Sequence, residues 1–308
     1  MNGVLNKARL LKINSLIPLN HRNNPDLRYF WYITAATTLS VCNQPKDVAT
    51  LYKYAIITAS INNNNNNNNN NATDVHHIKL GLDNSCNDQD LLISTILGDN
   101  HELSLREANF TLLQKNISSK FKEAILKSSC IAGIPKAINS LHEIAQSVEK
   151  ENLHETTTNN IEDKFRIKIH APDFNRISDY NQYVTENNHN KRENILARGF
   201  DHWNLIYNKV SDKIINNLNA SDPDLWYIIL STCYAPILSN DSVLNAKETS
   251  LIVISALVPQ DVNPQLYGHL KGALNVGCTK EEVQSVEDLS ILISEWCGIT
   301  WKRKCIKL

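Results

Sequence analysis

The sequence has few glycines, one methionine, no long apolar run and almost no net charge. With nine glycines in 308 residues, neither a GxGxxG nor a GxxxxGK[ST] phosphate-binding loop occurs. The longest apolar run, at 251–258, is far shorter than the roughly 20 residues that span a membrane. A formal net charge of −1 excludes a strongly basic nucleic-acid binder. We therefore expect a globular protein without a nucleic-acid or membrane partner.

Metal and thiol motifs are also missing. His76 and His77 stand together without a second pair of ligands, so no metal site is predicted. The seven cysteines form no CxxC pair and favour buried thiols in a reducing compartment over a redox role. They are Cys42, Cys86, Cys130, Cys233, Cys278, Cys297 and Cys305.

Asparagine is abundant, and ten consecutive asparagines occupy positions 62–71. Such a tract has no apolar surface to bury against its ordering entropy, so we predict a disordered insertion at about 61–77. A second polar stretch, rich in Asn, Glu, Thr and His, predicts a linker at 149–195, with a short ordered piece at 165–170.

The remaining sequence has helical periodicity. One apolar face at spacings of three, four and seven predicts a helix through Trp203, Ile206, Tyr207, Val210, Ile214 and Leu218. Four more helices are predicted at 226–238, 246–257, 264–276 and 280–296. Gly277 ends the third of these, and Thr279 with Glu282 forms a capping box for the fourth. Alternating strand patterns are nearly absent, so the predicted fold class is all-α.

The two halves of the chain resemble each other. Pro-Asp-Leu begins at residues 25 and 223, and each copy precedes an apolar helix with a cysteine, Cys42 or Cys233. Later, the stretch 121–135 resembles 286–300, so that Cys130 corresponds to Cys297. Similarities in the same order favour a duplication. The basic, acid-free start is typical of a mitochondrial presequence, but its likeness to 208–225 favours a first structural helix.

The densest motif runs from residue 248 to 283. It contains a helix with Glu248, then His269-Leu270-Lys271-Gly272-Ala273 within an HxxxAxxxG pattern, then Thr279-Lys280-Glu281-Glu282-Val283. This region resembles the carboxymuconolactone decarboxylase and alkylhydroperoxidase D superfamily, and 132–141 resembles its AGxPxAxNxL element. The arrangement is most similar to a group of fungal members found in peroxisomes or mitochondria.

The resemblance implies a duplicated, AhpD-like helical bundle that assembles as a homo-oligomer. Its first repeat would span 1–148, its second 196–302, and a tail 303–308. It also implies a site at a helix interface, with His269 as general acid/base and Glu248 as its orienting partner. No cofactor is implied. Peroxidase members carry CxxC where this chain has Val262 and Gln265, which argues against a dithiol peroxidase.

Two functions remain open. One is a cofactor-independent lyase or isomerase acting on a small carboxylated or carbonyl substrate. The other is a non-catalytic oligomeric or binding protein of the same fold, in which His269 only packs at a helix crossing and Glu248 is a solvated first-turn acid. A pocket around His269 would favour the enzyme.

The last residues, Ile306, Lys307 and Leu308, resemble a Ser-Lys-Leu peroxisomal address. Ile306 replaces the small residue, whereas the basic run before it fits. We therefore expect a peroxisomal matrix location and binding to a peroxisomal import receptor. The alternatives are the mitochondrion or the cytosol, with a solvated basic tail.

Overall fold

The structure is a computed structural model that describes residues 3–22, 24–66, 93, 96–97, 105–107, 110–149 and 189–308. It is all-α, as the sequence predicts, apart from a short parallel pairing of β1 (Leu105–Arg106) with β2 (Val148–Glu149). The helices described in the first half of the chain are α1 (Lys7–Leu16), α2 (Leu19–Arg22), α3 (Pro25–Val41), α4 (Pro45–Asn66), α6 (Leu112–Ala132) and α7 (Ile134–Gln146).

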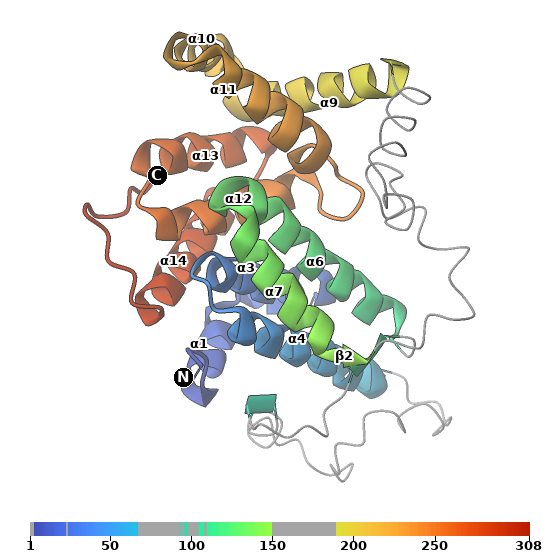
Figure 1. Ribbon diagram of the computed structural model, residues 1–308. Helices are drawn as coiled ribbons and strands as arrows, with labels where there is room; N and C mark the ends of the chain where they lie inside the picture. The colour runs from blue at the N-terminus through green and yellow to red at the C-terminus, as the bar shows by residue number, and fades with distance from the viewer. Residues whose placement is uncertain are drawn as a thin grey trace.

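The second half contains one π-helix and two 3-10 turns among its α-helices. Its elements are α9 (His189–Tyr207), η4 (Asn208–Val210), α10 (Ser211–Ser221), α11 (Pro223–Ile228), the π-helix η5 (Ile229–Leu238), α12 (Ala246–Leu257), η6 (Val258–Gln260), α13 (Asn263–Val276) and α14 (Lys280–Trp296). Figure 1 shows α9, α10 and α11 at one end of the molecule, above α13.

Helix α3 lies at the centre of the core. From Tyr29 to Val41 every one of its residues is buried, which is typical of a helix that is apolar on all sides. It packs against α4 and α6 of its own half and against α12 and α14 of the other. Two of its buried hydroxyls are satisfied within the helix, since Thr34 and Thr37 donate to carbonyls four residues earlier. The two halves thus share one continuous core.

The helices predicted at 246–257, 264–276 and 280–296 are confirmed as α12, α13 and α14, whereas the helix predicted at 226–238 is divided between α11 and the π-helix η5. Helix α13 ends at Gly277, which adopts the left-handed conformation with φ 99°, and the capping box of Thr279 with Glu282 is present at the start of α14. In each half the Pro-Asp-Leu motif begins a helix, α3 or α11. The duplication itself stays a prediction.

The single helix predicted through 203–218 is wrong. The chain turns at Asn208, whose φ of 46° is left-handed and ends α9 before α10 begins. Asparagine tolerates this conformation better than most residues. Ser211 stabilises the turn, because its hydroxyl donates to Asn204 and accepts from the Trp203 indole.

Helices extend into the predicted insertion from its start and into the predicted linker from its end. Helix α4 continues into the asparagine tract as far as Asn66, because extending an existing helix adds one hydrogen bond for each residue fixed. The boundary predicted at 195 falls within α9, which begins at His189. The rest of the insertion, and the ordered piece expected at 165–170, lie outside the described residues.

Candidate functional site

His269 lies on α13 at the crossing with α9. Its side chain is buried, and its Nε2 is 3.2 Å from the hydroxyl of Tyr207, which in turn is 3.1 Å from the hydroxyl of Tyr234. Burial lowers the pKa of His269 to about 4, and the nearby His202 acts in the same direction. The imidazole is therefore neutral near pH 7 and belongs to a buried histidine–tyrosine chain.

Glu248 lies at the start of α12, where it closes the helix end. One carboxylate oxygen accepts from the Asn245 backbone at 2.9 Å, while the Asn245 side chain accepts from the Glu248 backbone. The other oxygen forms an ion pair with Lys120 of α6 at 2.6 Å. The structure thus gives Glu248 and His269 separate partners and does not join them by a hydrogen bond.

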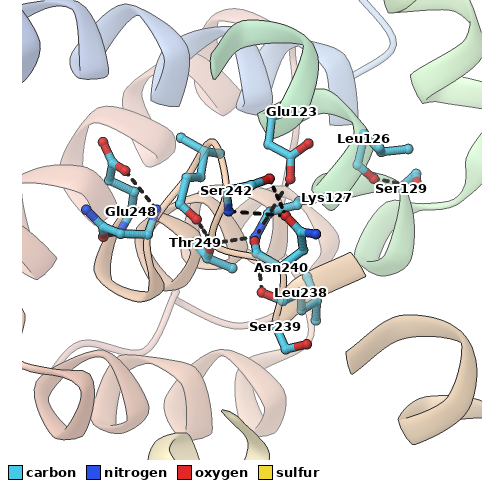
Figure 2. Close-up of polar contacts among 12 residues, drawn as sticks. Glu123, Leu126, Lys127, Ser129, Leu238, Ser239, Asn240, Ser242, Glu248 and Thr249 are labelled. Atoms are coloured by element: carbon cyan, nitrogen blue, oxygen red, sulfur yellow. Dashed lines mark hydrogen bonds and ion pairs between the residues drawn. The ribbon is translucent and has the colours of Figure 1, made fainter. Parts of the chain in front are cut away.

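A buried lysine that the sequence analysis missed lies near Glu248. Lys127 of α6 is 0% exposed, and Figure 2 shows its side chain directed at the connection between η5 and α12. Its ammonium donates to Leu238 O at 3.1 Å, Asn240 O at 2.6 Å and Thr249 Oγ1 at 2.8 Å. These bonds use all three donors of an ammonium group. Lys127 thereby fixes the η5–α12 connection to α6.

The charge of Lys127 is costly in this position. Burial lowers its pKa to about 7, and the negative charge of Asp241 opposes that shift. The Glu123 carboxylate lies 3.8 Å away, one helical turn earlier. The sequence does contain a signal, because position 127 follows Phe121 and Ala124 on the buried face of α6, where a lysine is unusual.

The segment held by Lys127 forms one wall of a pocket of about 350 Å³. Helix α9 forms the opposite wall. The lining residues are Arg198, Asp201, His202, Leu205, Leu238, Ser239, Asp241, Leu244 and Ala246. Arg198 connects the two walls, since its guanidinium donates to Ser239 Oγ at 3.0 Å and Ala235 O at 3.1 Å. The volume suits a small metabolite.

His202 is the chemically most informative residue of this pocket. It is buried, and its Nε2 has no hydrogen-bond partner among the described residues, which is unusual for a buried polar atom. Burial lowers its pKa to about 4; the positive charges of Lys127 and Arg198 act in the same direction, and Asp241 opposes them. His202 is therefore a neutral imidazole beside a cationic and an anionic side chain.

The sequence offered one signal for this pocket. Arg198, His202 and Leu205 follow each other at spacings of four and three, which places them on one face of α9. Nothing in the sequence places that face opposite the η5–α12 connection. His269 does not line the pocket. The ring of His202, however, lies 6.2 Å from the ring of Tyr234, the last side chain in the hydrogen-bonded series that begins at His269.

The predicted targeting residues lie along α13 and α14. The backbone of Ile306 donates to Asn263 Oδ1 at 3.0 Å, Lys307 pairs with Asp288 at 2.5 Å, and Leu308 packs against the core. Within the described part of the chain, no cluster of metal-ligating side chains is present. None of the helices described there is long and apolar enough to cross a membrane.

Comparison with known proteins gives two kinds of similarity. The profile of the Carboxymuconolactone decarboxylase family matches residues 227–306. Over its full length the chain is 39% identical to "Peroxisomal protein 2" of Saccharomyces cerevisiae, with 100% of both proteins covered. A protein of the same name from Schizosaccharomyces pombe is 39% identical over 187 residues, covering 61% of this chain and 74% of the relative. No solved structure matches.

Proposed function

The chain belongs to the carboxymuconolactone decarboxylase family, and from that membership we propose that the pocket between α9 and the η5–α12 connection is an active site. The proposed activity is that of a cofactor-independent lyase or isomerase acting on a small carboxylated or carbonyl metabolite. The observation that carries this proposal is His202, a buried histidine whose Nε2 has no hydrogen-bond partner within the described part of the chain and whose side chain lines a pocket of about 350 Å³ with Arg198.

The roles follow from the charges of the lining residues. Arg198 has guanidinium donors beyond those that bind Ser239 and Ala235, and guanidinium groups bind carboxylates well. A bound carboxylate near His202 raises the pKa of the imidazole, because an opposite charge favours its protonated form. His202 then acts as the proton-transfer group, as a decarboxylating lyase requires when the carbon that keeps the electron pair is protonated after carbon dioxide leaves.

His269 and Glu248 have supporting roles in this proposal. The chain from His269 through Tyr207 to Tyr234 fixes the aromatic ring beside His202. Glu248 fixes α12 to α6 through Lys120. The proton-transfer role that the sequence suggested for His269 passes to His202, because His202 and not His269 lines the pocket.

A homo-oligomer is favoured by the unequal burial of the two Pro-Asp-Leu helices. In α3, Tyr29 is 2% and Phe30 is 7% exposed, whereas the corresponding Tyr227 and Ile228 of α11 are 58% and 52% exposed. The apolar face that the first half covers with other helices is open in the second half. We propose that a second copy of the chain covers it. The same observation supports the alternative function, a non-catalytic oligomeric protein.

The relatives named "Peroxisomal protein 2" support a peroxisomal location, with mitochondrion or cytosol as alternatives. We propose the peroxisomal matrix, with the 306–308 segment read by an import receptor. A fluorescent protein fused to the N-terminus should colocalise with a peroxisomal marker, and a diffuse or mitochondrial signal would contradict the proposal.

The test of function is a metabolite comparison in cells that lack the protein. The deletion strain is rescued at matched protein level by wild type, His202→Gln or His142→Gln. His142 is the matched control because it lies exposed on α7. We expect His202→Gln to accumulate the same compound as the deletion and His142→Gln to restore the wild-type level. Full rescue by His202→Gln favours the non-catalytic alternative.

A further inference from the structure

The segment 299–308, called the strap below, lies against the body of the second half. It follows α14 without forming a helix, and Figure 1 shows the chain end returning to α13. The strap has an apolar inner side that packs against the core, formed by Trp301, Cys305, Ile306 and Leu308. Its basic side chains, Lys302, Arg303, Lys304 and Lys307, are exposed.

The backbone of the strap is hydrogen-bonded to two side chains near the start of α13. The amide of Lys302 donates to Asp261 Oδ2 at 3.0 Å. The amide of Ile306 donates to Asn263 Oδ1 at 3.0 Å, and the Asn263 amide group donates to Lys304 O at 3.2 Å. Asn263 therefore holds the strap at two points, on either side of position 305.

We propose that the docked strap hides the import signal at 306–308, so that the import receptor binds only chains whose strap is released. This inference rests on the proposed peroxisomal address. It adds to that address a folded state in which the receptor cannot read it, and it names Asn263 and Asp261 as the residues that maintain this state.

Docking of the strap and binding of the receptor exclude each other. A receptor reads a C-terminal address through the side chains and backbone of the last residues. In the docked strap the amide of Ile306 is already bound to Asn263, and the side chains of Ile306 and Leu308 pack against the core. A receptor pocket cannot enclose side chains that the protein itself covers.

The outer part of the strap is held weakly enough to leave. The ion pair of Lys307 with Asp288 joins side chains that are 43% and 51% exposed, and such pairs contribute little. The start of the strap has a firmer anchor, because the indole of Trp301 donates to Val258 O at 2.7 Å. We expect residues 302–308 to open locally around this anchor. The apparent receptor affinity then falls in proportion to the released fraction.

The first test compares binding of the purified full-length import receptor to the folded full-length protein and to a synthetic peptide of residues 299–308. We expect wild type to bind at least about tenfold more weakly than the peptide. Asn263→Ala removes two hydrogen bonds to the strap and should bind about tenfold more tightly than wild type. Gln265→Ala, at an exposed residue of the same helix, is the control and should bind like wild type.

Hydrogen exchange measures the same equilibrium without the receptor. The amide of Ile306 exchanges when the strap leaves Asn263. Its exchange in wild type should be slower than in the peptide by the same factor as the loss of receptor affinity, because both quantities report the ratio of docked to released chains. In Asn263→Ala the exchange should approach the rate of the peptide.

Asp261→Gly is a second variant, needed if Asn263→Ala melts at a much lower temperature than wild type. Glycine keeps the left-handed turn of Asp261, whose φ is 58°. The variant loses only the acceptor of the Lys302 amide, so it should raise receptor affinity about threefold.

Three results overturn the proposal, and they are distinguishable. If wild type binds as tightly as the peptide, the strap does not hide the signal, although the peroxisomal address stands. If wild type binds weakly but neither variant binds better, docking at Asn263 and Asp261 is not the cause. If the peptide itself does not bind the receptor, the address fails and its masking fails with it.

Discussion

Lys127 shows how one residue organises the candidate pocket. Its three hydrogen bonds hold the end of η5, the following loop and α12 to α6 (Figure 2). The segment held in this way supplies Leu238, Ser239 and Asp241 to the pocket. Desolvating a buried ammonium group is costly. Removing it from the folded protein, however, would leave the buried acceptors around it without hydrogen-bond donors.

Replacing this lysine should therefore destabilise the fold. We expect Lys127→Met to lower the free energy of unfolding by about 3 kcal/mol, because buried acceptors lose charged donors. Lys122→Met on the same helix is the control; its ion pair with Glu107 is about two-fifths exposed, so its loss should cost under about 1 kcal/mol. Urea unfolding measures both, and equal effects would show that Lys127 does not hold the connection.

The two buried histidines should make the fold sensitive to acid. Burial holds the pKa of His202 and His269 at about 4 in the folded chain, below the ordinary 6.5. Between these values the unfolded chain binds more protons than the folded chain. Stability is therefore full above pH 6.5 and falls as the pH drops toward 4, by ~3 kcal/mol for each histidine.

This sensitivity to acid should decrease when both histidines are replaced. Wild type should melt at a much lower temperature at pH 4.5 than at pH 7, and the double variant His202→Gln/His269→Gln should show a smaller difference between the two pH values. His142→Gln should leave the difference unchanged. If the double variant loses as much stability in acid as wild type, the buried imidazoles are not its cause.

At the scale of elements, the crossing of α9 and α13 depends on a close approach. A Cβ atom at Gly272 would lie 2.5 Å from Ile206 Cγ2, whereas one at Gly268 would meet nothing nearer than Tyr207 Cε1 at 3.7 Å. Both glycines are inside the same helix. Gly268 can therefore be replaced by a residue with a side chain, whereas the packing against Ile206 requires glycine at position 272.

These two glycines predict substitutions of opposite sign. We expect Gly272→Ala to destabilise the protein by about 2 kcal/mol through overpacking, and Gly268→Ala to stabilise it by about 0.5 kcal/mol through helix propensity. Thermal melts of both variants check the pair. A stable Gly272→Ala would mean that α9 and α13 are not in close contact.

The elements divide clearly into those that sequence predicts and those that it does not. Helices 246–257 and 280–296 carry their own signals, a capping residue and an apolar face, and the structure has them at those bounds. The break at Asn208 was missed because its neighbours continue a helical apolar pattern. The π-helix η5 was read as part of an ordinary helix, although it contains Pro236, which cannot donate a helical hydrogen bond.

At the scale of the whole molecule, the open face of α11 predicts assembly. Light scattering should give a mass that is a multiple of 34.8 kDa. A charge placed in an apolar interface is costly, so Tyr227→Asp and Ile228→Asp should shift the protein to the monomer. Leu112→Asp, at a residue that is 86% exposed on α6, is the control and should keep the oligomer. A monomeric wild type contradicts the proposed contact.

The candidate pocket is formed by residues from elements that are far apart in the chain, so the sequence alone did not predict it. The family motif directs attention to His269, which is hydrogen-bonded to Tyr207, and to Glu248, which belongs to the capping box of α12. Arg198 and His202 come from α9, Asp241 from a loop, and Lys127 from the other half of the chain. Their proximity is set by helix packing across the shared core, which no local pattern in the sequence encodes.

The most direct test of the central claim, that this pocket is catalytic through His202, adds purified protein to a metabolite extract of the deletion strain. We expect wild type and His142→Gln to consume a small carboxylated or carbonyl compound, measured by mass spectrometry. His202→Gln should consume it at least about 100-fold more slowly, the usual contribution of a proton-transfer residue, while melting within a few degrees of wild type. Equal consumption by His202→Gln, or no consumption by any of the proteins, would contradict the account.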